Sequence, residues 1–319
     1  MTYSRRQFGT IALGSIPLAS LALYESRLFA ADKPNSVFNG VQIGLIIPYS
    51  YHGMASDAQS LLDDVVRDNI SACESHCEPI EQYAGAGVPA GRGGRAPLTP
   101  EQIAAQKAAA DAMTKWRLSV PMDKFVELRK MYNDAGVRIY AFKLELTEAM
   151  PDEEYDYTFN VAKIVGANIV SMEMPENGDL TNRVGKFATK HKMMVGYHAH
   201  LQATPSTWDQ AMSQSAYNGI NLDIGHYTAA GNHDVVAFIQ EHHDRITHVH
   251  LKDRKFPENG GQNMPWGQGD TPIKDVLQLM KKEKYKFPAT IELEYAPPEG
   301  SDSEKEIVRC LAFAKAALA

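Results

Sequence analysis

The sequence predicts a single-domain α/β protein: a closed (β/α)8 barrel, or TIM barrel, with a loop and helix inserted after the second strand. From residue 41 onward, short β-branched apolar runs alternate with longer amphipathic stretches, which is typical of βα units. Eight strand candidates fit into about 255 residues, and a closed barrel takes about 250. No glycine-rich phosphate fingerprint opens an expected helix, which counts against a dinucleotide-binding sheet.

The strands are expected where short apolar runs lie between turn residues. These runs are 41–48, 70–74, 137–146, 168–174, 192–200, 219–226, 246–252 and 288–295. Helices are expected in amphipathic segments between them, at 56–69, 122–135, 155–165 and 181–191. Ser56 is the expected N-cap of the first helix, because its hydroxyl can accept from an exposed backbone N–H. Gly136 and Gly166 end the second and third, because glycine readily takes the left-handed conformation that closes a helix.

Residues 83–117 interrupt this alternation. Residues 83–100 are rich in Gly, Ala, Pro and Arg, and an alanine-rich helix is expected at 99–113 with Thr99 as its N-cap. Two interpretations are open: a surface insertion, or a lid over the functional end of the barrel. A lid would bring cationic and aromatic side chains to an anionic or sugar ligand, namely Arg92, Arg95, Trp116 and Arg117.

The composition is that of an ordinary globular chain. Of 319 residues, 44% are hydrophobic and 22% charged, a balance that argues against intrinsic disorder. The net charge of −7 disfavours a nucleic-acid partner, which would require a basic face. Three cysteines are too few for a disulfide framework.

The N-terminus resembles a twin-arginine export signal. The run S-R-R-Q-F at residues 4–8 precedes an apolar run at 11–23, and Ala30 begins a small-residue cleavage region. The apolar run is too short to span a bilayer, and a retained anchoring helix is the alternative. We expect residues 1–30 to be a signal peptide and residues 38–319 to form an exported, periplasmic barrel without a membrane span.

Acidic residues and histidines gather at the C-terminal ends of the last five expected strands. Because side chains alternate along a strand, three pairs each share a face: His198 with His200, His248 with His250, and Glu292 with Glu294. Unpaired buried charge is costly, so the set indicates convergence on a divalent cation. Oxygen and imidazole ligands without thiolates suit Mn²⁺, Co²⁺, Mg²⁺ or Zn²⁺.

Four segments stand out near the expected strand ends: L-D-I-G-H at 222–226, H-V-H-L-K-D at 248–253, G-Q-G-D at 267–270 and I-E at 291–292. Together they resemble the xylose-isomerase-like barrel superfamily, in its sugar isomerase/epimerase branch. They follow the family order L-D-x-G-H, H-x-H-x-K-D, G-x-G, E, within a resemblance that covers roughly residues 40–315. The G-x-G turn is expected to shape the wall of the pocket.

The resemblance implies metal binding by Asp223, His250 and Glu292. Many members take a further ligand from a glutamate on an earlier strand, which forms an acid/base pair with the eighth-strand glutamate. Here the fifth-strand position is His198, so the chain departs from the pattern. Either Glu173 on the fourth strand restores a carboxylate, or His198 takes the ligand position itself.

Residue roles follow from this resemblance. The predicted metal ligands are Glu173, Asp223, His250 and Glu292, and the predicted catalytic residues are Glu173, Glu292 and His198. His226 is either a metal ligand or a contact to a substrate hydroxyl. The predicted substrate contacts are His200, His226, Lys252, Glu145, Trp116 and Arg117.

The implied function is a divalent-metal-dependent isomerase or epimerase acting on a sugar, keto-sugar or cyclitol. A metal ion that holds neighbouring oxygens of a hydroxyketone acidifies the adjacent C–H, and a base then removes that proton to give an enediolate. Expulsion of a leaving group from the same intermediate would make the protein a lyase or dehydratase acting on a 3-keto-glycoside or an inosose.

Two further alternatives are a phosphodiesterase like the AP-endonuclease branch, with additional histidines such as His52 and His76, and a non-catalytic carbohydrate-binding barrel. The expected partner is a small carbohydrate, and homo-oligomerisation is left open.

Overall fold

The structure, a computed structural model, describes residues 33–87 and 99–319. The predicted signal peptide and two of the proposed lid residues, Arg92 and Arg95, lie outside the described residues. The barrel unit spans Pro34–Ala319. Within the described part of the chain, none of the helices combines the length and the apolar character that a membrane span requires.

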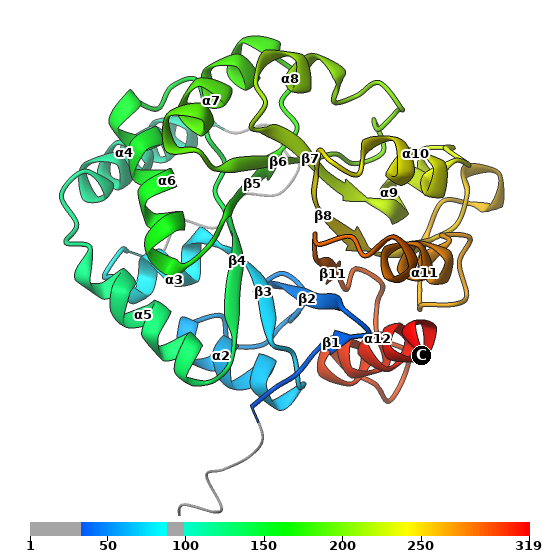
Figure 1. The fold of residues 1–319 in the computed structure, drawn as a ribbon. Coiled ribbons are helices and arrows are strands. Elements are labelled where there is room, and N and C mark those ends of the chain that lie inside the picture. The colour runs from blue at the N-terminus through cyan, green and yellow to red at the C-terminus, as the bar shows by residue number, and fades with distance from the viewer. Residues whose placement is uncertain (1–32, 88–98) are drawn as a thin grey trace, which may run out of the picture. The chain divides into compact units, whose positions relative to one another are not determined.

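Eight parallel strands form a closed ring, so the predicted (β/α)8 fold is confirmed (Figure 1). Each strand pairs with the next along the chain, and the ring closes because β2 pairs with β3 on one side and with β11 on the other. Nearly every strand residue is buried, since one face fills the barrel and the other packs on helices. The strands are β2 (Val41–Ile47), β3 (Ala72–His76), β4 (Arg138–Lys143), β5 (Ile169–Glu173), β6 (Met194–His198), β7 (Asn218–Asp223), β8 (Ile246–Leu251) and β11 (Ala289–Ile291).

Helices follow the strands and surround the ring in Figure 1. They are α2 (Ala58–Arg67), α3 (Cys77–Tyr83), α4 (Pro100–Arg117), α5 (Asp123–Asp134), α6 (Asp152–Val165), α7 (Gly178–His191), α8 (Asp209–Gln214), α9 (Ile224–Ala229), α10 (Val235–His242), α11 (Ile273–Glu283) and α12 (Ser303–Leu318). The short elements are β1 (Val37–Phe38), which pairs antiparallel with β2, the pair β9 (Asp253–Arg254) and β10 (Asn263–Met264), and the 3₁₀ turn η1 (Pro257–Asn259). Apolar side chains from strands and helices form one main buried cluster, which fixes the ring and the positions of its strand ends.

Several predicted elements shift at their ends. The first helix is capped by the side chain of Asp57 rather than by Ser56. The expected sixth strand ends early at Asp223, where the chain turns into α9, and the expected eighth strand ends at Ile291. Gly166, at a φ of 95°, ends α6 as predicted. The shortened strands matter most, because the predicted functional residues lie at these ends.

The insertion contains α4, which begins at the predicted cap. The Thr99 side chain accepts the backbone N–H of Gln102, and the Gln102 side chain accepts the N–H of Thr99. Most of α4 is exposed, but its last turn is anchored. Arg117 is buried and donates to Glu81 over 2.8 Å and to Glu154 over 2.7 Å.

Trp116 and Arg117, two predicted substrate contacts, pack against neighbouring helices in this structure. The guanidinium of Arg117 is committed to two buried carboxylates on α3 and α6. The ring of Trp116 packs edge-on against Tyr157 of α6, with 6.4 Å between ring centroids. Both side chains therefore tie the insertion to neighbouring helices.

Candidate metal centre and active site

Four buried side chains converge at the C-terminal ends of neighbouring strands. His198 ends β6, Asp223 ends β7, His250 lies on β8 and Glu292 directly follows β11. One nitrogen or oxygen from each residue lies within 4.8 Å of those of the others. We call these residues the four-residue cluster. Burial of so many ionisable groups requires that they pair or bind an ion.

Strand register brings the four residues together. Asp223 lies opposite His250 across β7 and β8, and β8 also pairs with β11, which leads directly into Glu292. His198 lies opposite Asn221, two residues before Asp223. Because parallel strands end on the same rim of a barrel, residues far apart in the chain meet there.

His198 presents its Nε2 to the cluster because its Nδ1 is already used. Nδ1 lies 2.9 Å from Glu173 Oε2, a carboxylate oxygen that accepts its hydrogen. A neutral imidazole that donates from Nδ1 keeps a lone pair on Nε2, and this Nε2 lies 3.5 Å from Asp223 Oδ2. Of the two residues left open for the remaining ligand position, this geometry favours His198 over Glu173.

Glu173, a predicted metal ligand and proton-transfer residue, is engaged in hydrogen bonds in this structure. Its Oε1 accepts from Lys143 over 2.6 Å, and its Oε2 accepts from His198 and from His200 Nε2, at 3.0 Å. Burial raises the pKa of Glu173, but these hydrogen bonds and the charge of Lys143 hold that pKa well below its usual value. Glu173 thus orients its three partners. The backbone N–H of Glu173 donates to the side chain of Glu145 over 3.0 Å. Glu145, another predicted substrate contact, therefore lies at the same rim.

His250 lies between two carboxylates. Its Nδ1 is 2.7 Å from Glu292 Oε2, and its Nε2 is 2.6 Å from Glu74 Oε2. Burial alone would lower the pKa of His250, but the two carboxylates overcome this effect and raise it to about 10. Both ring nitrogens therefore face negative charge, and a proton or a cation is needed between Nδ1 and Glu292.

Lys252 places an ammonium group among the same carboxylates. Its Nζ lies 3.0 Å from Asp223 Oδ2, 3.3 Å from Glu292 Oε1 and 2.6 Å from Glu294 Oε2. Burial lowers the pKa of Lys252, but these carboxylates raise it above its usual value. The group is therefore charged at neutral pH, and it lies at the rim where the sequence predicts a substrate contact.

The two nitrogens of His226 have different partners. Arg254 Nη1 lies 2.7 Å from Nδ1, and because arginine only donates, Nδ1 carries a lone pair. Burial and the charge of Lys252 outweigh the effect of Asp223 and lower the pKa of His226 to about 4, so the ring is neutral at pH 7 with its proton on Nε2. Lys252 Nζ lies 3.0 Å from Nε2, so both ring nitrogens face a cationic donor. A neutral ring accepts at only one of them, and the shorter contact, to Arg254, assigns the lone pair to Nδ1.

His226 therefore presents an N–H to the rim. Its Nε2 lies 3.7 Å from Glu294 Oε2 and 3.8 Å from Asp223 Oδ2. Of the two roles that the sequence left open, this protonation state favours a contact to a substrate oxygen over metal ligation.

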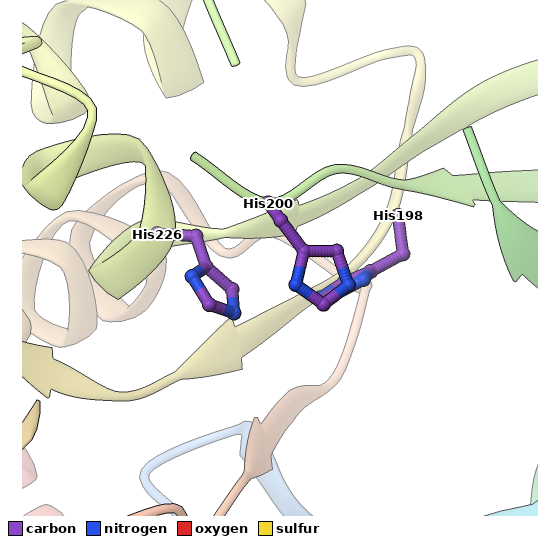
Figure 2. A group of neighbouring side chains, drawn as sticks. All are labelled: His198, His200 and His226. Atoms are coloured by element: carbon purple, nitrogen blue, oxygen red, sulfur yellow. The ribbon is translucent and has the colours of Figure 1, made fainter. Parts of the chain in front are cut away.

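His198, His200 and His226 also form a compact group (Figure 2). The ring centroids of His198 and His200 are 4.7 Å apart, and those of His200 and His226 are 4.5 Å apart. His198 and His200 donate to Glu173 from Nδ1 and Nε2 and keep a lone pair on the other nitrogen. Only the tautomer assigned to His226, whose Nε2 carries the proton, argues against a metal ion held by all three. The side chain of His200 is 51% exposed, so this group opens to solvent and can contact a hydroxyl-rich ligand.

The four-residue cluster fits a divalent cation. Two imidazole nitrogens and two carboxylates form a mixed donor set without thiolates, and the imidazoles favour a transition-metal ion over Mg²⁺. His198 Nε2 and His250 Nδ1 both face carboxylate oxygens, so a proton or a cation must lie between each nitrogen and its oxygen. Carboxylates also outnumber ammonium groups at this rim, with Glu74, Glu173, Asp223, Glu292 and Glu294 around Lys143 and Lys252. A dication would offset that excess.

Two glycines permit this arrangement. A Cβ at Gly225 would lie 2.5 Å from the carbonyl oxygen of Lys252, so glycine allows α9 to start beside β8. A Cβ at Gly269 would lie 1.9 Å from Asp253 Oδ1. Asp253 Oδ2 accepts the N–H groups of Gly267 and Gly269 over 2.8 and 2.9 Å, which ties the predicted G-x-G turn to the chain segment directly after Lys252.

Sequence reasoning missed three side chains of this site: Glu74, Lys143 and Arg254. Glu74 is fully buried on β3, and Lys143 is buried at the end of β4. A charged residue inside an apolar strand run was the available signal for both. Arg254 gave no such signal, because nothing in the sequence indicates its contact with His226, 28 positions earlier.

Comparison with known protein families agrees with this arrangement. Residues 176–315 match the family model described as xylose isomerase-like TIM barrel. That stretch contains all four residues of the cluster.

The curated relatives are similar over part of their length. Inosose dehydratase of Lactiplantibacillus plantarum is 29% identical over 144 residues, which are 39% of this chain and 47% of that protein. An inosose dehydratase of Clostridium beijerinckii is 28% identical over 114 residues, 34% of this chain and 32% of that protein. The chain thus spans about half the length, or less, of the curated relatives that it matches.

Solved structures share the fold over most of the chain. The probable 3-DHS dehydratase of Bacillus anthracis has a TM-score of 0.58 at 14% identity, covering 85% of this chain and 99% of that one. An L-ribulose 3-epimerase has a TM-score of 0.58 at 14% identity, covering 87% and 94%. At these identities the likeness shows the fold alone.

Proposed function

We propose that the protein is a divalent-metal-dependent enzyme that moves a proton next to the carbonyl group of a sugar, keto-sugar or cyclitol. The observation that carries this proposal is the four-residue cluster, whose donors from four strands converge at the C-terminal rim. In barrel enzymes this rim is where catalysis takes place. The names of the similar proteins, sugar epimerase and cyclitol dehydratase, support the same substrate class.

In this proposal His198, Asp223, His250 and Glu292 hold the cation. When bound, it polarises a substrate carbonyl and acidifies the neighbouring C–H. We assign the proton transfer to Glu292, because its carboxylate lies in the cluster and the family resemblance implies a catalytic glutamate on the eighth strand. Isomerisation or epimerisation results when the proton returns to the substrate.

Elimination is the second candidate, and the donors on the rim favour it. The ammonium group of Lys252 and the Nε2–H of His226 lie beside the cluster, where they can hydrogen-bond to an oxygen that leaves from the carbon next to the reacting C–H. The relatives named inosose dehydratase and 3-DHS dehydratase support this outcome. A lyase or dehydratase would therefore use the same residues.

The remaining alternatives receive less support. Within the described residues, His52 and His76 belong to none of the groups whose donors lie close enough to share a metal ion, so the further histidines of a phosphodiesterase are not assembled. A carbohydrate-binding barrel without turnover remains an outcome of the test below.

We also propose that the chain is exported to the periplasm, and the twin-arginine run alone supports this proposal.

The test is hydrogen exchange in deuterated water with a panel of keto-sugars and inososes, using protein loaded with Mn²⁺, Co²⁺ or Zn²⁺. We expect deuterium to enter one substrate next to its carbonyl. A product whose mass exceeds that of the substrate only by the incorporated deuterium indicates isomerisation or epimerisation. A product that has lost water or an alcohol indicates elimination. Absence of exchange and of products with every substrate would contradict both forms of the proposal.

The variant Glu292→Gln separates catalysis from folding. We expect turnover to fall by roughly 100-fold or more, the range for loss of a general acid or base, with an unchanged circular dichroism spectrum. Glu258→Gln is the matched control, because Glu258 is an exposed carboxylate whose partner is His233. Near-normal turnover of Glu292→Gln would mean that another group moves the proton.

A further inference from the structure

A carboxylate that none of the roles above uses lies behind His250. Glu74 of β3 has an exposed fraction of 0%. Its Oε2 lies 2.6 Å from His250 Nε2 and 3.0 Å from His248 Nε2. Its Oε1 has no hydrogen-bond partner among the described residues. One carboxylate oxygen therefore serves two imidazoles inside the barrel.

This geometry fixes which ring nitrogens carry protons. A proton on Oε1 of Glu74 would find no acceptor, and a proton on Oε2 could serve only one of the two rings, so Glu74 accepts while His248 and His250 donate from Nε2. When a cation takes the place of the second proton of His250, Nδ1 offers its lone pair to the cluster, where it lies 2.7 Å from Glu292 Oε2.

Asn221 is compatible with this assignment. Its amide nitrogen lies 3.2 Å from His250 Nε2, while its Oδ1 has no partner among the described residues. With the amide turned over, Oδ1 can accept from the same Nε2–H and from the hydroxyl of Ser171, which lies 3.3 Å from that position, while the amide nitrogen takes the place that has no partner.

The other imidazole of the cluster has the same kind of support. Glu173 accepts from His198 Nδ1 and leaves Nε2 for the cluster, just as Glu74 accepts from His250 Nε2 and leaves Nδ1. The two histidines use opposite nitrogens, yet each has a carboxylate on the side away from the cluster. A carboxylate in that position fixes the tautomer and orientation of a metal-binding histidine and increases its basicity.

We propose that Glu74 is a positioning residue of the metal centre, which directs Nδ1 of His250 toward the cation and strengthens it as a ligand. The inference rests on the proposed function, since it concerns the same centre. It predicts an effect on metal affinity that a packing role of Glu74 would not produce.

The first test is metal affinity, measured by calorimetric titration of folded, metal-stripped protein with Mn²⁺ and with Co²⁺. For Glu74→Gln, which keeps the shape but removes the charge, we expect the dissociation constant to rise by roughly 10- to 100-fold. Glu74→Asp keeps the charge on a shorter side chain, and we expect a smaller rise. Asp68→Asn is the matched control, a buried carboxylate that accepts from Tyr51 over 2.6 Å outside the cluster, and its affinity should equal that of the parent.

The outcomes separate the two proposals. If the parent binds neither ion, the proposed function and this inference both fail. If the parent binds and Glu74→Gln binds within about twofold of it, the inference alone is overturned.

A second measurement needs no variant and so does not depend on whether Glu74→Gln folds. Nitrogen-15 spectra of the zinc-loaded parent should show His250 with a metal-bound Nδ1 and a protonated Nε2. A metal-bound Nε2 in His250 would overturn the inference.

Discussion

At the rim of this barrel, the partner of one ring nitrogen decides what the other nitrogen of a histidine can do. Glu173 takes the Nδ1–H of His198, so this ring offers a lone pair to the cluster. Arg254 takes the lone pair of His226 Nδ1, so this ring offers an N–H instead. Two histidines 5.8 Å apart between ring centroids therefore have opposite chemistry, one as a ligand and one as a donor.

Arg254 is the residue on which the donor role of His226 depends. For Arg254→Met we expect kcat to fall roughly 10- to 100-fold, because a hydrogen bond from a charged group contributes about 1.5–3 kcal/mol and the ring can then turn or change tautomer. Metal affinity should stay that of the parent. Steady-state kinetics and calorimetric titration measure the two quantities.

Arg254→Lys is the companion variant, because its ammonium group can still donate and should restore part of the activity. A loss of metal affinity in Arg254→Met would show instead that His226 is a ligand.

At the scale of elements, the site depends on where strands stop. The strand β7 ends at Asp223. The Oδ1 of Asp223 can therefore accept the backbone N–H of His226 over 2.7 Å and cap α9. The same carboxylate thus begins a helix with one oxygen and faces the cluster with the other. An expected strand that continued to residue 226 would have placed His226 on a strand face.

The insertion is anchored through Arg117. Replacing it with methionine leaves Glu81 and Glu154 buried without a cation, and breaking a buried pair in this way costs about 3–5 kcal/mol. We therefore expect Arg117→Met to lower the free energy of unfolding, measured by urea denaturation, while kcat and KM of the folded protein stay unchanged. Arg129→Met is the control, since Arg129 is exposed and contacts only a backbone carbonyl of Ile164 among its hydrogen-bond partners in the described residues. If Arg117→Met instead raised KM and left the free energy of unfolding unchanged, that result would support Arg117 as a substrate contact.

At the scale of the whole molecule, negative charge is concentrated where the barrel strands end. The chain carries a net charge of −7, and several of its carboxylates lie buried together around the four-residue cluster. These donor groups lie together only in the folded chain. A cation that binds only the folded barrel should therefore stabilise the whole domain.

We expect Mn²⁺ or Co²⁺ at 100 times its dissociation constant to stabilise the protein by about 2.7 kcal/mol. This corresponds to an increase of several degrees in Tm for a domain of this size, and a chelator should reverse it. Thermal unfolding followed by circular dichroism measures the shift. In Asp223→Asn the shift should shrink or vanish, whereas an equal shift in that variant would place the stabilising ion elsewhere.

The barrel itself follows from local sequence patterns. Alternation of apolar runs and amphipathic stretches predicts β2, β5 and the helices α2, α5 and α6, since periodicity and glycine stops depend on neighbours in the chain. The motifs around Asp223, His250 and Glu292 likewise indicate three members of the cluster, because a family pattern preserves their order and spacing.

The sequence by itself therefore determined the fold class, the rim on which the site lies and the residue types that form it. Only the tertiary structure decided that His198 and not Glu173 completes the cluster, that Arg117 anchors a helix, and that Glu74 stands behind His250. The physical reason is that ligation and tautomer depend on which nitrogen or oxygen faces which partner across the barrel. Such contacts join residues up to 176 positions apart, and no local pattern encodes them.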